Sequence, residues 1–80
     1  MRANIYVTLK QEVLDPQGDA VARALSSLGF EGIRSVRVGK LIELDVDAPN
    51  RAAAEESLRT MCEKLLANPV IEDFRFELVD

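Results

Sequence analysis

Apolar and polar residues alternate at both ends of the chain. Near the beginning, the apolar positions are Ala3, Ile5, Val7 and Leu9. Near the end, they are Phe74, Phe76 and Leu78. Because successive side chains of a strand point to opposite faces, this alternation predicts two half-buried strands, over residues 3–9 and 72–80, each with one solvated face.

A helix is predicted between the first strand and Gly29. Asp15 can cap the free backbone amides, and Pro16 sits at the first helical position, where its missing N–H costs nothing. Gly29 provides a left-handed stop. Apolar residues recur at helical spacing, at Val21, Leu25 and Leu28.

Residues 35–46 predict two strands joined near Gly39. Placing Val36 and Val38 on the same face as the apolar residues that follow requires a loop with an odd number of residues, or a β-bulge. Gly39 is the residue suited to it, since glycine has no Cβ to clash. Leu41 then points away from the core. The apolar residues that follow are Ile42, Leu44 and Val46.

A second helix begins after Asn50, which is a capping residue, and ends at Asn68-Pro69. Its apolar stripe consists of Ala54, Leu58, Met61 and Leu65. The predicted order is therefore β-α-β-β-α-β in a single domain of residues 1–80. This order favours an α+β, ferredoxin-like fold, with a four-stranded antiparallel sheet and two helices on one face.

A chain of 80 residues buries only about 60–65% of the surface that its unfolded form exposes, so its core is thin. Disulfides within the chain are excluded because Cys62 is the only cysteine. The chain has no histidine, which leaves a metal site poorly supplied with ligands. Self-association is then the expected source of further stability.

The net charge of −4 argues against a nucleic-acid partner and against an anionic membrane surface. The first residues run into a strand pattern without the apolar segment of a signal peptide, and no apolar run approaches the roughly 20 residues of a membrane span. These features predict a cytoplasmic protein.

Three groups of residues are candidate sites of chemistry. Cys62 sits in the middle of a helix without a histidine base, which favours a buried hydrophobic role over a nucleophile. Val38-Gly39-Lys40 resembles a loop with a gatekeeper lysine more than a phosphate cradle. Strand carboxylates are typical of a solvated face rather than of a metal site, and these are Glu43, Asp45 and Asp47.

Contact between chains is predicted at the outer side of the sheet and near the two loops. Val13 and Leu14 are apolar residues in a loop that should be exposed to solvent. Tyr6 and Leu41 interrupt an otherwise polar face. The predicted interface residues are Tyr6, Val13, Leu14, Arg37, Gly39, Lys40 and Leu41.

Two long blocks of the sequence resemble one known family. They are the segments 13–18 (VLDPQG) and 62–72 (CEKLLANPVIE), joined by 36–40 (VRVGK) between them. Together they resemble the PurS family, the small subunit of phosphoribosylformylglycinamidine synthase. The resemblance covers nearly the whole chain in the right order.

The resemblance implies a non-catalytic subunit of a three-part enzyme of de novo purine biosynthesis. A glutaminase subunit would release ammonia, and a large synthetase subunit would use ATP and magnesium to insert it. The small subunit, as a homodimer, would bridge the two and bind no cofactor itself. The missing histidine agrees with this, because a glutaminase cysteine needs a histidine base.

Rival interpretations require features that this sequence lacks. An ACT-like regulatory module that binds a small molecule would typically carry a glycine-rich loop after the first strand, where this chain has residues 10–14 without glycine. An acylphosphatase-like enzyme would need an arginine in that loop. An RNA-recognition module would need more aromatic residues than Tyr6 on its central strands.

Overall fold

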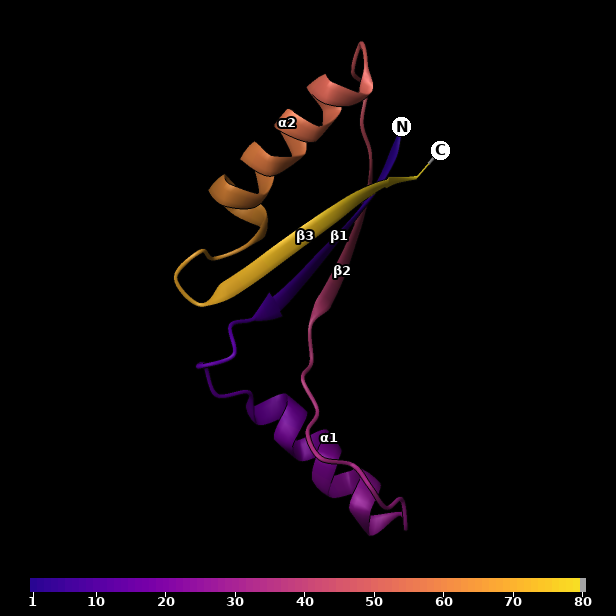
Figure 1. Cartoon of the computed structure of the whole chain (residues 1–80), viewed down its shortest axis with the longest axis vertical. Helices are drawn as coiled ribbons and strands as arrows, with labels where there is room; N and C mark the ends of the chain where they lie inside the picture. The colour runs from indigo at the N-terminus through magenta and orange to yellow at the C-terminus, as the bar shows by residue number, and fades with distance from the viewer. Residues whose placement is uncertain (80) are drawn as a thin grey trace.

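The sheet is antiparallel and has β1 at its centre. The computed structural model describes residues 1–79, and within them the strands are β1 (Arg2–Leu9), β2 (Lys40–Asp45) and β3 (Glu72–Val79). Their order is β2-β1-β3 (Figure 1). Both predicted terminal strands are therefore confirmed, except that Asp80 lies outside the described residues.

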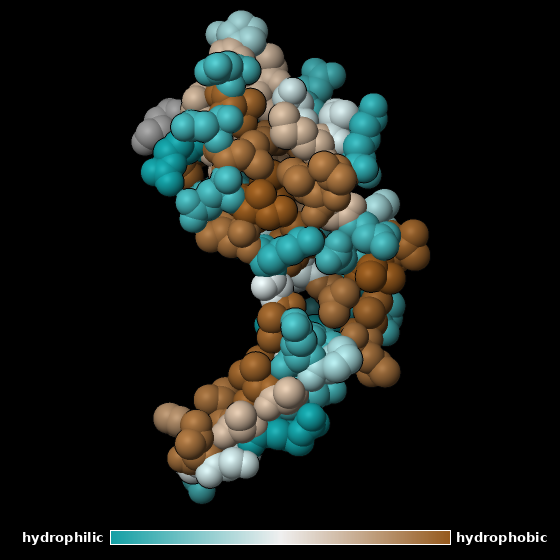
Figure 2. Space-filling model, turned by 180° about the vertical axis from the view of Figure 1, so that it is seen from behind, coloured by the Kyte–Doolittle hydropathy of each residue, from teal (hydrophilic) through white to brown (hydrophobic). Residues whose placement is uncertain are grey.

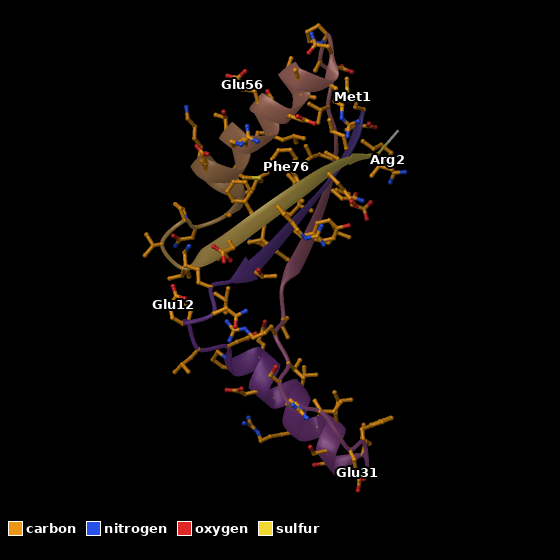
Figure 3. The ribbon with its side chains drawn as sticks, in the orientation of Figure 1. Met1, Arg2, Glu12, Glu31, Glu56 and Phe76 are labelled. Atoms are coloured by element: carbon orange, nitrogen blue, oxygen red, sulfur yellow. The ribbon has the colours of Figure 1, made fainter. Side chains whose placement is uncertain are left out.

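The inner face of the sheet packs against the second helix. In β1, Ile5 lies opposite Ile42 on one side and Phe76 on the other. Helix α2 (Arg51–Met61) continues into a π-helical turn, η1 (Cys62–Leu66), above this face. Figure 3 shows Phe76 pointing from β3 toward α2. The largest fully buried side chains are Ile5, Val7, Leu58 and Cys62, so the core is as thin as the chain length predicts.

Both helices begin where the sequence predicts. The Asp15 carboxylate accepts a hydrogen bond of 2.9 Å from the Gly18 amide at the start of α1 (Pro16–Ser27). The Asn50 side chain accepts one of 2.8 Å from the Ala53 amide at the start of α2. Each bond satisfies one of the amides that a first helical turn leaves without a partner.

Helix α1 does not cover the sheet. It extends away from one end of the sheet, and residues 28–38 return beside it (Figure 1). We call residues 16–38, helix α1 with this returning segment, the α1 arm. Gly29 and Gly32 reverse the chain at the tip with φ values of 92° and 83°, where residues with a Cβ are strained. Glu31 marks the tip of the arm in Figure 3.

The predicted four-stranded ferredoxin-like sheet with both helices on one face is wrong. Within residues 1–79 the sheet has three strands, and the segment holding Val36 and Val38 is not one of them. The chain runs through Gly39 directly into β2, so the predicted hairpin with its bulge does not form. Hydrogen bonds explain this difference, because Asp15 accepts the Val38 amide at 2.7 Å and thereby holds the segment to the start of α1.

The resulting shape is elongated. The Cα radius of gyration is 16.0 Å, and the principal extents are 51 × 27 × 15 Å. A compact domain of this length would have a radius of gyration of about 12 Å. The excess comes from the α1 arm, which projects beyond the body formed by the sheet and α2 (Figure 1).

Replacing Gly18 with alanine should destabilise the fold. A Cβ at Gly18 would lie 2.1 Å from the Val36 carbonyl oxygen, so the two halves of the α1 arm would have to separate. We expect a loss of about 1–3 kcal/mol in the free energy of unfolding, measured by urea denaturation, although alanine is the better helix former. The matched control is Gln17→Ala at the exposed neighbouring position, expected to stay within about 0.5 kcal/mol of wild type. Equal stabilities of Gly18→Ala and wild type would contradict the packing.

Candidate functional site

The junction between β1 and the α1 arm is organised by one carboxylate. Asp15 is 4% exposed. Its Oδ1 accepts the Gly18 amide at 2.9 Å, and its Oδ2 accepts the Val38 amide at 2.7 Å. These backbone bonds lower the pKa of Asp15, and they outweigh the opposing effect of desolvation. Asp15 thus ties the start of α1 to the end of the returning segment.

Arg37 holds the loop that precedes Asp15. Its guanidinium Nη2 donates hydrogen bonds to the carbonyl oxygens of Lys10 at 2.8 Å and Val13 at 2.9 Å. Gly39 passes so close to β1 that a Cβ there would lie 2.6 Å from the Val7 carbonyl oxygen. We call this set of contacts, made by Asp15, Arg37, Gly18 and Gly39, the elbow.

A second polar cluster lies on the outer face of the sheet, opposite α2. The Tyr6 hydroxyl donates a hydrogen bond of 2.8 Å to Glu77 Oε1, and Asn4 Nδ2 donates to the same oxygen at 3.4 Å. The Arg75 guanidinium lies 3.9 Å from the centroid of the Tyr6 ring, in a cation–π contact. The bond to Glu77 raises the pKa of Tyr6, and the same bond lowers the pKa of Glu77. The cluster is a pre-organised, exposed patch.

The predicted interface residues fall into two groups. Tyr6 and Leu41 are opposite each other on the outer face, where Leu41 is 50% exposed. Leu14 projects from the loop before α1 with 84% of its surface exposed. The remaining predicted residues belong to the elbow or adjoin it. They are Val13, Arg37, Gly39 and Lys40. Their role in an interface stays a prediction.

The sequence did not indicate the most exposed apolar residues of the α1 arm. Val21 and Leu28, predicted to face the sheet, are 40% and 74% exposed. Phe30 and Ile33, which belong to no predicted element, are 57% and 41% exposed. Apolar residues outside every predicted element were the feature of the sequence that could have indicated this exposed apolar surface. Figure 2 shows apolar surface along the arm as well as on the body.

A groove of about 670 Å³ runs between β2 and the α2–η1 helix. Its apolar lining consists of Leu44, Ala53, Met61, Leu65 and Leu66. Leu65 is 82% exposed. Glu56 stands at the rim and points outward from α2 (Figure 3). We call this feature the α2 groove.

Cys62 is a core residue. It is fully buried beside Leu58, and desolvation raises the pKa of its thiol. A raised pKa leaves less of the nucleophilic thiolate near neutral pH. The prediction of a buried, hydrophobic role is therefore confirmed.

The described residues contain no group of three potential metal ligands, so the structure does not bring Glu43, Asp45 and Asp47 together as one. No helix among residues 1–79 is long and apolar enough to span a membrane.

The pKa of Tyr6 can be measured directly because Tyr6 is the only tyrosine of the chain. We expect ultraviolet absorbance titration to give a pKa above the ordinary tyrosine value of about 10. Glu77→Gln should lower that pKa, because the carboxylate acceptor loses its charge. Glu43→Gln is the control, a carboxylate on the same face that lies opposite Asn4. The same shift from both variants would contradict the specific bond.

The contribution of Asp15 to stability should depend on pH. Because its pKa is lowered by folding, the stabilisation is present above the unfolded value of about 3.9 and is lost as pH falls through the folded pKa. The difference in unfolding free energy between wild type and Asp15→Asn should therefore shrink below about pH 4, as measured by urea denaturation. The control is Asp19→Asn, an exposed acid in the first turn of α1. A constant difference from pH 3 to 7 would refute the elbow assignment.

Comparisons with known proteins identify the family. The family model described as PurS, phosphoribosylformylglycinamidine (FGAM) synthase, matches residues 2–80. A relative from Synechocystis sp., the PurS subunit of phosphoribosylformylglycinamidine synthase, is 54% identical over 74 residues, which cover 92% of this chain and 74% of the relative. The same subunit from Bacillus subtilis is 47% identical over 77 residues, covering 96% and 90%.

Solved structures agree with this family assignment. Bacillus subtilis PurS superposes with a TM-score of 0.86 at 46% identity, over 99% of this chain and 98% of that one. A chain in the structure of PurLQS from Thermotoga maritima gives a TM-score of 0.90 at 34% identity, over 98% and 95%. The chain therefore belongs to the PurS family of phosphoribosylformylglycinamidine synthase subunits.

Proposed function

We propose that this chain is the non-catalytic small subunit of phosphoribosylformylglycinamidine synthase in de novo purine biosynthesis. The observation that carries the proposal is the family match over residues 2–80. In the complex, the chain bridges the ATP-dependent synthetase subunit and the glutaminase subunit, so that ammonia passes from one to the other. The relative in a structure named PurLQS supports membership in such an assembly.

The side chains support a structural role over a catalytic one. A glutaminase that uses cysteine needs an activated thiolate and a histidine base. This chain has no histidine, and its one cysteine is fully buried with a raised pKa. The nucleophile, the base and the site for ATP and magnesium therefore belong to the partner subunits, and this chain binds no cofactor of its own.

The shape of the molecule also supports an assembly role. The chain exposes Leu14, Leu41 and an apolar arm, and all of these are available for contacts with other chains. We propose that it acts in the cytoplasm as a homodimer in contact with both larger subunits. The interface residues predicted from the sequence remain part of this proposal.

Reconstitution from purified subunits tests the function. The chain alone should show neither glutaminase nor ATPase activity, because it lacks the groups for either reaction. Mixed with a synthetase and a glutaminase subunit of the same organism, it should restore glutamine-dependent synthesis of the amidine product. The control is the two larger subunits without it. Undiminished glutamine-dependent activity in that control would contradict the bridging role.

Calorimetric titration distinguishes the proposed function from the ACT-like alternative. A regulatory module of that class would bind a free amino acid or another small ligand at a defined ratio. We expect no binding heat from the purified chain with free amino acids. Saturable binding of one of them would favour the alternative.

A further inference from the structure

Strand β3 forms an edge of the sheet along its whole length. Within residues 1–79, β3 pairs with β1 on one side and with no strand on the other (Figure 1). All of its residues, Glu72–Val79, are in register with β1. The free side of an edge strand presents backbone N–H and C=O groups in the geometry that another strand needs. The β3 edge is therefore a potential site for an extended segment of another chain.

The alternation of hydrogen bonds in an antiparallel ladder identifies the backbone groups that face this edge. The Lys10 amide donates to the Ile71 carbonyl oxygen at 2.9 Å, which continues the register of β1 and β3. Paired residues alternate between exchanging hydrogen bonds and facing each other without them, so every second residue of β3 counted from Ile71 bonds to β1. The residues between them direct their backbone groups outward. Beyond Glu72, whose amide is bonded to the Asn68 carbonyl oxygen, these residues are Phe74, Phe76 and Leu78.

The bonds on the other side of β1 give the same assignment. Met1 and Val46 exchange backbone hydrogen bonds of 2.9 and 2.7 Å. Odd-numbered residues of β1 therefore bond to β2, which leaves the even-numbered residues for β3. We call the N–H groups of Phe74, Phe76 and Leu78 the outward amides. Within residues 1–79, no strand is present to accept from them.

Apolar side chains line the inner side of the β3 edge. Phe74, Phe76 and Leu78 pack against the core and are only partly buried. They are the same residues that carry the outward amides. Residues of an added strand that bond to these amides place their side chains on the same face of the sheet. Apolar residues at those alternate positions would therefore complete the burial of this row.

One arginine lies on each face of the sheet at the middle of the β3 edge. On the outer face, the Arg75 guanidinium is 3.9 Å from the centroid of the Tyr6 ring. On the inner face, the guanidinium of Arg59 from α2 is 5.7 Å from the centroid of the Phe76 ring. Neither arginine forms an ion pair among the described residues. An arginine stacked on an aromatic ring keeps its N–H donors available for a carboxylate.

The carboxylates on either side of Arg75 are already bonded within the chain. Asp73 accepts a hydrogen bond of 2.9 Å from Lys10 Nζ, and Glu77 accepts one of 2.8 Å from the Tyr6 hydroxyl. A carboxylate for Arg75 is therefore best supplied by a different strand. A second copy of β3 is a poorer match, because its own outer-face carboxylates are bonded in the same way.

We infer that the β3 edge binds an extended segment of one of the two larger subunits, which joins the sheet as a further strand next to β3. The segment carries apolar residues at alternate positions, beside Phe74, Phe76 and Leu78, and between them an acidic residue that pairs with Arg75. This inference rests on the proposed function, which supplies the larger subunits, and assigns a surface to one of them. In strand addition, backbone hydrogen bonds give affinity and alternate side chains give specificity.

Amide hydrogen exchange tests the inference. In the chain alone, the outward amides should exchange quickly, and the neighbouring amides of Asp73, Arg75 and Glu77 should be protected by β1. In a complex with the larger subunits of the same organism, exchange of the outward amides should slow by at least about 100-fold, whereas the neighbouring amides change little. Adding the synthetase and glutaminase subunits separately identifies which of them supplies the segment.

Methylation of single backbone nitrogens separates the edge from the fold. Cys62 allows synthetic residues 62–80 to be ligated to recombinant residues 1–61. A methyl group on the Phe76 nitrogen removes an outward donor, so it should leave the urea midpoint unchanged and weaken binding to the larger subunit by at least about 10-fold. The matched control is a methyl group on the Glu77 nitrogen, which removes a donor to β1 and should lower the midpoint. The unmodified ligated chain is the reference for both.

Removing the charge of Arg75 tests the acidic residue of the segment. Arg75→Gln should weaken binding to the larger subunit about 3-fold at low salt, and this difference should shrink as salt is raised. Arg51→Gln, at an exposed arginine at the start of α2, is the control and should bind as wild type does. Equal binding by the Arg75 variant and wild type at low salt would contradict the proposed ion pair.

The other outcomes contradict distinct claims. If neither larger subunit forms a complex with the chain, the proposed function fails together with the inference. If a complex forms and the outward amides exchange as in the chain alone, the inference alone is overturned. Protection of the outward amides in the chain alone would also overturn it, and would assign the β3 edge to a second copy.

Discussion

The arrangement of this molecule depends on the two hydrogen bonds that the Asp15 carboxylate accepts. One comes from the Gly18 amide at the start of α1, and the other from the Val38 amide just before β2. A single side chain thus caps a helix and binds the segment that returns beside it. Because the Val38 amide is engaged there, the segment around it does not join the sheet, and the helix is held away from the body.

The thin core follows from this separation. With α1 held outside, α2 and η1 cover the inner face of the sheet, and the largest fully buried side chains are Ile5, Val7, Leu58 and Cys62. Apolar residues that a closed fold would bury are exposed on the arm and in the α2 groove. For a chain of 80 residues, a partner is the physical remedy for so small a core.

The thin core and the exposed surfaces fit the proposed place of the chain in a larger enzyme. The chain has no histidine and its one cysteine is buried, and in the proposed function it contributes surfaces for contact while its partner subunits contribute the reactive groups. The outer face offers the polar cluster around Tyr6, and the arm offers an apolar stripe. Two chemically different surfaces on one small chain suit a protein that contacts more than one kind of neighbour.

Local rules in the sequence determined the strands at both ends, the helix caps at Asp15 and Asn50, and the buried state of Cys62. Alternation, helical spacing and capping chemistry act over a few residues, so they can be read without knowing the neighbours in space. The sequence also indicated the family, because residues 13–18 and 62–72 carry its pattern.

Only the tertiary structure decided where α1 and the segment around Val38 go. Their apolar spacing is the same whether they cover their own sheet or project from it, and the choice rests on contacts between residues far apart in sequence. The bond from Val38 to Asp15 joins residues 23 positions apart, and Arg37 bonds to a carbonyl 27 positions away. Hydrophobic periodicity indicates which residues are suited to burial, but it does not indicate which surface, or which molecule, buries them.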